Sequence, residues 1–175
     1  IEVVFYERNY QHLTGVELLD QEGDVLRGQS INFYRKCIEN KLSVNEIKFR
    51  DDGTTPLKLT ALPVLMDVTK ITKITGDYNN VRPYLFVDKV MWNVNFCLGL
   101  TKEQETYVPS SALLEDMKHF VNTPSQVLAI LEKEIYTEIY DRIKHVAKGL
   151  NLNNLRLPDE ISQKISLKHY IYKGK

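Results

Sequence analysis

The sequence contains little of several residue types that mark particular classes of protein. Its 175 residues include only eight glycines, six prolines, two cysteines and four histidines. The low glycine and proline content argues against a collagen-like or disordered chain. Lysine plus arginine equal aspartate plus glutamate, at 23 each, which argues against a protein that is basic all over but not against a local basic groove. The longest apolar run is far below the roughly 18 residues that a membrane helix needs, so no membrane contact is expected.

The two cysteines, Cys37 and Cys97, do not form a metal-binding pattern with the histidines. No histidine lies at ligand spacing from either of them, so neither a metal nor another cofactor is expected. Interpreted as buried free thiols, the cysteines favour a reducing compartment. Residues 1–6 do not have the pattern of a signal peptide. We therefore expect a cytoplasmic protein.

The short motifs of several hydrolase classes are also missing. There is no Gly-x-Ser-x-Gly, no P-loop Gly-Lys-Ser/Thr and no His-Glu-x-x-His. What remains is an ordinary globular composition, 43% hydrophobic and 26% charged. Since domains commonly have about 100–150 residues, we predict one domain over residues 1–150. Residues 151–175 form a basic C-terminal extension, whose last 15 residues contain four lysines and no acidic residue.

Apolar periodicity predicts a mixed α+β domain. Helices are expected near residues 30–42 and 57–68, and strands near 71–75, 84–90, 92–100 and 105–108. The connections between these strands are short and polar. Because parallel crossovers need a dozen or more residues, the sheet is predicted to be antiparallel. Outside this core we expect strands at 1–6 and 44–49, a turn at 9–15 and a short helix after residue 111.

Residues 124–148 have the pattern of a long C-terminal helix. Thr123, Pro124 and Gln126 fit a capping box with proline at the first helical position. Apolar residues then recur at helical spacing up to Gly149. We expect this apolar stripe to pack on the apolar face of the 92–100 strand, which gives a core of Val94, Phe96, Leu98, Leu128, Leu131, Ile135 and Ile139.

Four phrases of the sequence, taken in order, resemble a known family. They are residues 12–15 (His-Leu-Thr-Gly), 33–42, 74–78 (Ile-Thr-Gly-Asp-Tyr) and 98–111. In this order and spacing they are similar to phage- and mobile-element-encoded domains that are grouped with barnase, EndoU, the tRNA-cutting colicins and RelE as nuclease-like proteins. The match extends from about residue 3 to about residue 140. It implies two helices followed by a four-stranded antiparallel sheet, in agreement with the periodicity, and the long helix would be an addition to that core.

The resemblance also implies a chemistry, the cleavage of RNA without a metal. The 2′-hydroxyl attacks the adjacent phosphate, which requires a base, an acid and a cation or hydrogen-bond donors for the phosphorane. His12 matches the His-Leu-Thr-Gly phrase and is the candidate acid or base. Lys58 is the candidate cation, Thr14 a candidate donor to phosphate, and Ser110 a candidate at a helix start, where free N–H groups bind phosphate.

Each of these residues also has a purely structural interpretation. His12 can order its own turn, Thr14 and Ser110 can act as local caps, and Lys58 can lie along a packed face with its ammonium at the surface. Arg82, Asp88 and Lys89 are weaker polar candidates.

Two classes of function therefore stay open. One is an endoribonuclease-like toxin or effector domain of a phage or mobile element, with RNA and a protein inhibitor as partners. The other is a non-enzymatic accessory protein on the same fold, which binds RNA or a protein. The first requires His12 and Lys58 to lie together in the fold.

Overall fold

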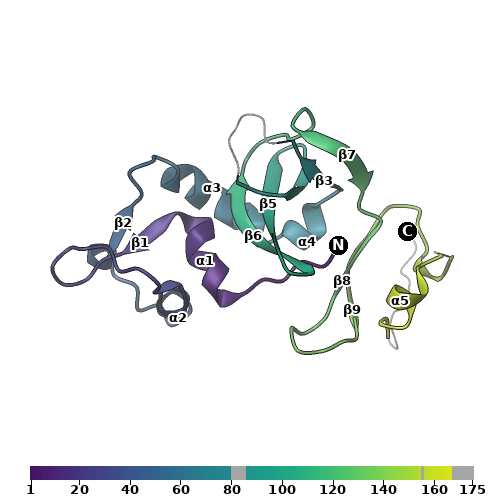
Figure 1. The fold of residues 1–175 in the computed structure, drawn as a ribbon, viewed down its shortest axis with the longest axis horizontal. Coiled ribbons are helices and arrows are strands. Elements are labelled where there is room, and N and C mark those ends of the chain that lie inside the picture. The colour runs from purple at the N-terminus through teal and green to yellow at the C-terminus, as the bar shows by residue number, and fades with distance from the viewer. Residues whose placement is uncertain (80–85, 155, 167–175) are drawn as a thin grey trace.

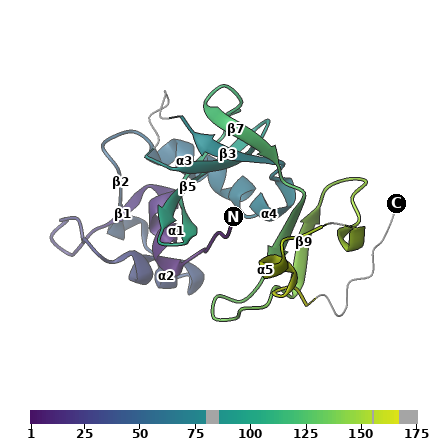
Figure 2. The same ribbon diagram turned by 45° about the vertical axis from the view of Figure 1, so that its right-hand side comes forward.

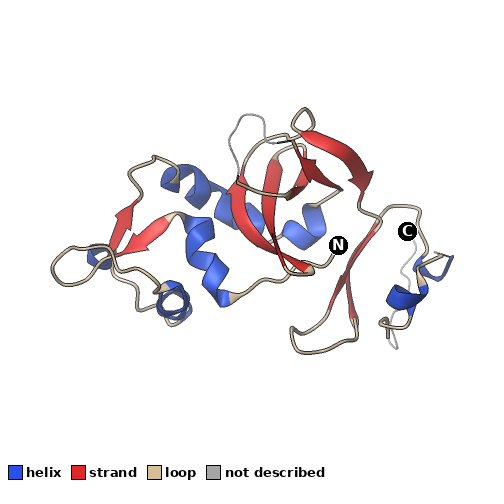
Figure 3. Ribbon diagram, in the orientation of Figure 1, coloured by secondary structure: helices blue, strands red, loops and turns tan. Residues whose placement is uncertain are grey.

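The computed structural model describes residues 1–79, 86–154 and 156–166. These residues form an α+β fold with one five-stranded sheet and two small two-stranded sheets. The large sheet has the order β6-β5-β4-β3-β7, and every neighbouring pair is antiparallel (Figures 1 and 3). Its strands are β3 (Ile74–Tyr78), β4 (Lys89–Asn93), β5 (Phe96–Glu103), β6 (Thr106–Leu113) and β7 (Val121–Gln126).

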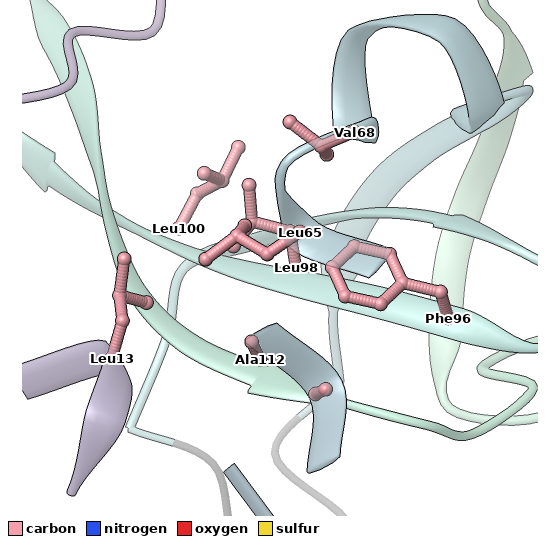
Figure 4. Packing of buried hydrophobic residues seen from close by; sticks show 8 residues of the cluster. Leu13, Leu65, Val68, Phe96, Leu98, Leu100 and Ala112 are labelled. Carbon is pink, nitrogen blue, oxygen red and sulfur yellow. The ribbon is translucent and has the colours of Figure 1, made fainter. Parts of the chain in front are cut away.

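Strand β5 forms the centre of the core because both of its faces are covered. Phe96, Leu98 and Leu100 point to one face and pack with Leu13 and Ala112 (Figure 4). The helices on this face are α1 (Glu7–Thr14), α3 (Thr55–Leu65) and α4 (Val68–Ile71). The alternate residue Cys97 points to the other face, where it joins a second cluster of Tyr78, Val87, Val90, Trp92 and Met117.

A smaller layer, built from residues 16–49, lies on the far side of α1 from the large sheet (Figure 1). Strands β1 (Val16–Leu18) and β2 (Ile47–Phe49) form an antiparallel pair, with Val16 opposite Phe49. Helix α2 (Ser30–Ile38) covers this pair through Phe33, which is buried with Val16 and Leu18. The 3₁₀ turn η1 (Val44–Glu46) leads into β2.

The predicted helix over residues 124–148 is wrong. This segment instead contains the end of β7 and a hairpin of β8 (Ala129–Glu132) and β9 (Arg142–Val146), which extends away from the large sheet in both views (Figures 1 and 2). Thr123, taken as a helix cap, has a positive φ of 46° inside β7. Pro124 is tolerated there because β7 is an edge strand. The described residues that follow the hairpin form only η2 (Leu152–Asn154) and the four-residue helix α5 (Asp159–Ser162).

The predicted core is correspondingly wrong in part. Phe96 and Leu98 are buried, as predicted. Val94 is 73% exposed because residues 94–95 form the two-residue loop between β4 and β5. Leu128, Ile135 and Ile139 are 40–42% exposed, and Leu131 is only half-buried, because the hairpin packs with fewer neighbours than a helix on the sheet would have.

Other local predictions also need correction. Residues 1–6 form an isolated bridge, Val3 with Tyr107, rather than a strand. The predicted turn at 9–15 is the end of α1. The strand predicted at 105–108 continues to Leu113, which replaces the short helix after residue 111. Of the predicted strand 84–90, residues 84–85 lie outside the described residues and 86–88 are not in a strand, because β4 begins at Lys89. None of the described helices is long and apolar enough to span a bilayer.

The different burial of two leucines predicts how much the truncation of each to alanine lowers the stability of the protein. Leu98 is fully buried between the sheet and the helices, whereas Leu128 is 42% exposed. We expect Leu98→Ala to lower the free energy of unfolding by about 2–5 kcal/mol, and Leu128→Ala by less than about 1 kcal/mol. Urea unfolding followed by circular dichroism measures both. Equal losses would contradict the arrangement of hairpin and core described above.

Candidate functional site

The C-terminal end of α1 meets the N-terminal end of α3 at Gly15. Gly15 ends α1 in the left-handed conformation, with φ of 69°, and its N–H bonds back to the carbonyls of Gln11 and His12. A Cβ on this residue would lie 3.0 Å from Lys58 Cδ and 3.2 Å from Thr55 Cα. Glycine is therefore required here both for the turn and for the close approach of the two helices.

The buried hydroxyl of Thr55 connects three segments of the chain at this junction. It donates a hydrogen bond to the carbonyl oxygen of Gly15 at 2.5 Å and accepts one from the N–H of Arg50 at 3.0 Å. Thr55 is completely buried. Since it fixes the end of α1, the start of α3 and the residue after β2 relative to one another, its position determines where the neighbouring basic side chains lie.

Lys58 lies one turn further along α3 and points back toward α1. Its Nζ donates to the carbonyl oxygen of His12 at 3.0 Å. Lys58 is the only charged residue in the described part of the chain that is buried, with 7% exposure. The other well-covered lysines that are described, Lys36, Lys89 and Lys133, each form an ion pair with a carboxylate. Lys58 forms none with a described carboxylate, and its contact to one neutral carbonyl leaves ammonium donors unused.

His12, on α1, is close enough to the other basic groups for their charges to act on it. Its pKa is lowered by the atoms that partly bury the imidazole, and further by the positive charges of Lys58 and Arg50. The residue remains exposed to solvent overall. The imidazole is therefore covered on one side and open on another, and it favours the neutral form, which accepts a proton.

Arg50 completes this basic cluster, and the sequence analysis did not identify it. Its charge lowers the pKa of His12 and also that of Lys58, whose burial is the larger cause. The only sequence signal for Arg50 was its place between a short strand and the turn at Asp51-Asp52-Gly53. The structure thus brings His12, Lys58 and Arg50 together from α1, α3 and the end of β2. Together they form a basic cluster that can attract an anion.

The other two predicted site residues have local partners. Thr14 is buried, and its hydroxyl donates to the Gln11 carbonyl at 2.7 Å and accepts the N–H of Val16 at 3.1 Å. Ser110 lies inside β6, not at a helix start, as the extra residue of a bulge. Its hydroxyl accepts from Thr101 Oγ1 at 2.9 Å. Thr101 follows Leu100 in β5 and so points to the sheet face opposite Leu13, which separates Ser110 from the basic cluster.

The weaker candidates lie elsewhere. Lys89 forms an ion pair with Asp77, and the carboxylate of Asp88 accepts the N–H of Lys102 at 2.7 Å. Arg82 is outside the described residues. Within residues that the structure describes, no group of three or more histidine, cysteine, aspartate or glutamate side chains is placed to hold a metal ion.

The junction at Gly15 predicts a strong effect of a single methyl group. We expect Gly15→Ala to lower the free energy of unfolding in two ways. The left-handed conformation costs alanine about 1 kcal/mol, and the close contacts of the added Cβ, which force α1 and α3 apart, cost about 1–3 kcal/mol more. Gly53→Ala is the matched control, because its φ is 73° but nothing lies within 4 Å of the added atom. Urea unfolding should show the larger loss for Gly15→Ala. Similar losses would mean that the helices are not in close contact.

The charges around His12 predict its titration. By NMR, its pKa should lie below the ordinary value of about 6.5, and Lys58→Met should raise it because one positive charge is removed. Since the folded state binds the proton less well than the unfolded state, His12 makes the protein less stable as the pH falls through about 6.5. His145→Ala is the control variant, because His145 is another histidine whose pKa is lowered and its NMR signal must be distinguished from that of His12. A pKa of His12 at or above 6.5 would contradict the cluster.

A family model matches most of the chain. Residues 1–149 match the family described as phage-Barnase-EndoU-ColicinE5/D-RelE like nuclease 4. No curated protein and no solved structure gives a significant match. The matched residues include the basic cluster, the large sheet and the β8–β9 hairpin. The resemblance predicted from four phrases is thus confirmed, and the chain belongs to this family of phage-associated nuclease-like domains.

Proposed function

We propose that the domain is an endoribonuclease that cleaves RNA without a metal, at the cluster of His12, Lys58 and Arg50. The observation that carries this proposal is the burial of Lys58 without an ion pair to any carboxylate in the described part of the chain. An unpaired buried charge is costly, so a fold that keeps one beside a second cation needs a compensating role for it. A phosphate group of a substrate supplies the missing negative charge.

The neutral form of His12 suits the role of general base. Its lowered pKa keeps the imidazole unprotonated near neutral pH, ready to accept the proton of a ribose 2′-hydroxyl. The 2′-oxygen then forms a bond to phosphorus and the bond to the 5′-oxygen breaks, which leaves a 2′,3′-cyclic phosphate and a 5′-hydroxyl. Positive charge beside the phosphate stabilises the phosphorane that lies between these states.

Lys58 suits two parts of the same reaction. Its ammonium offsets the charge on the phosphorane, and its lowered pKa makes it a stronger acid than an ordinary lysine. It can therefore supply the proton that the leaving 5′-oxygen requires. Cys37 and Cys97 are both free, which is compatible with action in a reducing cytoplasm.

One observation favours the second class of function, a non-enzymatic protein that binds RNA or a protein. The hydrogen bond from Lys58 to the His12 carbonyl is a contact of a cation with a helix C-terminus, which stabilises the fold without any substrate. In that case the basic cluster would bind a phosphate or carboxylate group and leave it unchanged. Cleavage assays separate the two functions.

The proposal predicts that the wild-type protein cleaves RNA in the presence of EDTA and leaves 2′,3′-cyclic phosphate ends. His12→Ala should lower the rate by about 10²–10⁴-fold, as expected for the loss of a general base. Lys58→Met should lower it as well, and should make binding less dependent on salt because one phosphate contact is lost. His145→Ala and Lys89→Ala are the matched controls and should keep full activity. Thermal unfolding shows whether each variant is folded.

The pH dependence of the rate gives a second measurement. Its acidic limb should fall below about 6.5, at the lowered pKa of His12. If the folded wild type cleaves no RNA with or without metal, but still binds it, the domain is the accessory protein described above. Full activity of a folded His12→Ala variant would remove His12 from the mechanism.

A further inference from the structure

Arg50 is placed differently from the other arginines whose ion pairs the structure describes. Arg8 is bound to Glu103 at 2.6 Å, and Arg142 is bound to Glu134 at 2.6 Å and to Glu132 at 3.1 Å. Arg50 has only a loose ion pair, with 3.9 Å between its Nε and Oε1 of Glu17. This Nε is buried and has no hydrogen-bond partner among the described residues. A buried donor without an acceptor requires an explanation.

The backbone around Arg50 is fixed although its guanidinium is not fully bonded. Its N–H donates to Thr55 Oγ1, which is itself bonded to Gly15. Glu17, on β1, faces Lys48 across the β1–β2 pair and approaches the Arg50 guanidinium without a hydrogen bond between Nε and its carboxylate. The backbone of Arg50 is thus fixed, whereas its side chain is 28% exposed and its buried Nε has no hydrogen bond to a described residue.

Four described residues besides Arg50 belong to the electrostatic surroundings of the Arg50–Lys58 pair. Lys58 is the cation, and His12 is a titratable imidazole whose lowered pKa favours the neutral form. Asp52 is near enough to act on Lys58, but its carboxylate oxygen already accepts the N–H and the hydroxyl of Thr54. Glu17 is the second carboxylate. No described carboxylate therefore binds Arg50 and Lys58 at hydrogen-bonding distance.

We propose that Arg50 and Lys58 together bind one phosphate group of the nucleic acid, and that Glu17 holds the Arg50 guanidinium in place until the phosphate binds. This deepens the proposed function and rests on it for the identity of the substrate. A guanidinium offers parallel N–H donors that fit two phosphate oxygens, and an ammonium adds a point charge. Because the bound phosphate and the Glu17 carboxylate repel each other, Glu17 weakens binding while it orients Arg50.

Binding can be tested without cleavage by the use of an RNA oligonucleotide with 2′-O-methyl groups, which lacks the attacking hydroxyl. Fluorescence anisotropy gives its affinity for the full chain, and inorganic phosphate serves as a competitor. Arg50→Gln should weaken binding of the oligonucleotide by about 10- to 100-fold, as for a lost hydrogen bond to a charged group. Arg50→Lys should restore part of it. Arg142→Gln is the matched control and should bind as the wild type does.

Glu17→Gln provides a test of opposite sign. Removal of its negative charge should tighten binding of the oligonucleotide by about 2- to 5-fold, the size of a weak ion pair. A structural role for Arg50 alone would predict no such gain. The NMR resonance of the His12 ring should also shift upon addition of inorganic phosphate in the wild type, and not in Arg50→Gln.

The outcomes separate this inference from the proposed function. If the wild type does not cleave RNA but Arg50→Gln loses binding and Glu17→Gln gains it, the phosphate site stands and the nuclease proposal fails. If the wild type cleaves RNA and a folded Arg50→Gln variant binds as tightly as the wild type, the nuclease proposal stands and the phosphate site is overturned. Weaker binding by Glu17→Gln also overturns it.

Discussion

The contact between α1 and α3 at Gly15 is the constraint on which the geometry of the basic cluster depends. A helix that ends in a left-handed glycine exposes its last carbonyls, and here Thr55 and Lys58 of α3 bind the carbonyl oxygens of Gly15 and His12. The same threonine fixes the backbone of Arg50. Three basic side chains from different segments are therefore positioned by a few buried hydrogen bonds and by one residue without a side chain. These bonds keep like charges close together, at a cost that the packing of Leu13 against β5 helps to offset.

The antiparallel order of the large sheet was predictable in part, because the connections between its strands are short and polar. The four predicted strands overlap β3, β4, β5 and β6, but the turn between the second and third was placed too early, since β4 runs from Lys89 to Asn93, and the fifth strand, β7, was not predicted. The segment 124–148 was not predictable from its pattern, since the same apolar spacing fits a helix stripe and a half-buried hairpin. Tertiary contacts determine that this segment is not a helix: β7 pairs with β3, and the N–H of Val127 donates a hydrogen bond to the carbonyl oxygen of Lys73. A capping box is a local signal, and such a partner overrides it.

For the candidate site, too, the sequence indicated some residues and missed or misplaced others. His12 and Lys58 were predicted from a family phrase and from a lysine among apolar residues; the structure joins them through the hydrogen bond from Lys58 Nζ to the His12 carbonyl oxygen, and their catalytic roles stay predictions. Ser110 was misplaced because Pro109-Ser110-Ser111 resembles a helix start, whereas the strand β6 continues through it. Arg50 carried only the weak sequence signal of its place between a short strand and a turn, because its significance arises from Thr55 and Glu17, residues that folding brings beside it.

The packing of Leu13 on β5 and β6 has a consequence for the order in which the protein is made. All three basic residues lie at or before position 58, so they leave the ribosome before β5 and β6 do. Yet α1 is held by Leu98, Leu100 and Ala112, which are synthesised about twice as far along the chain. The basic cluster therefore cannot reach its final geometry until β5 and β6 have emerged and paired. If the domain attacks RNA, the nascent domain remains harmless to the messenger and ribosome that produce it until β6 has emerged.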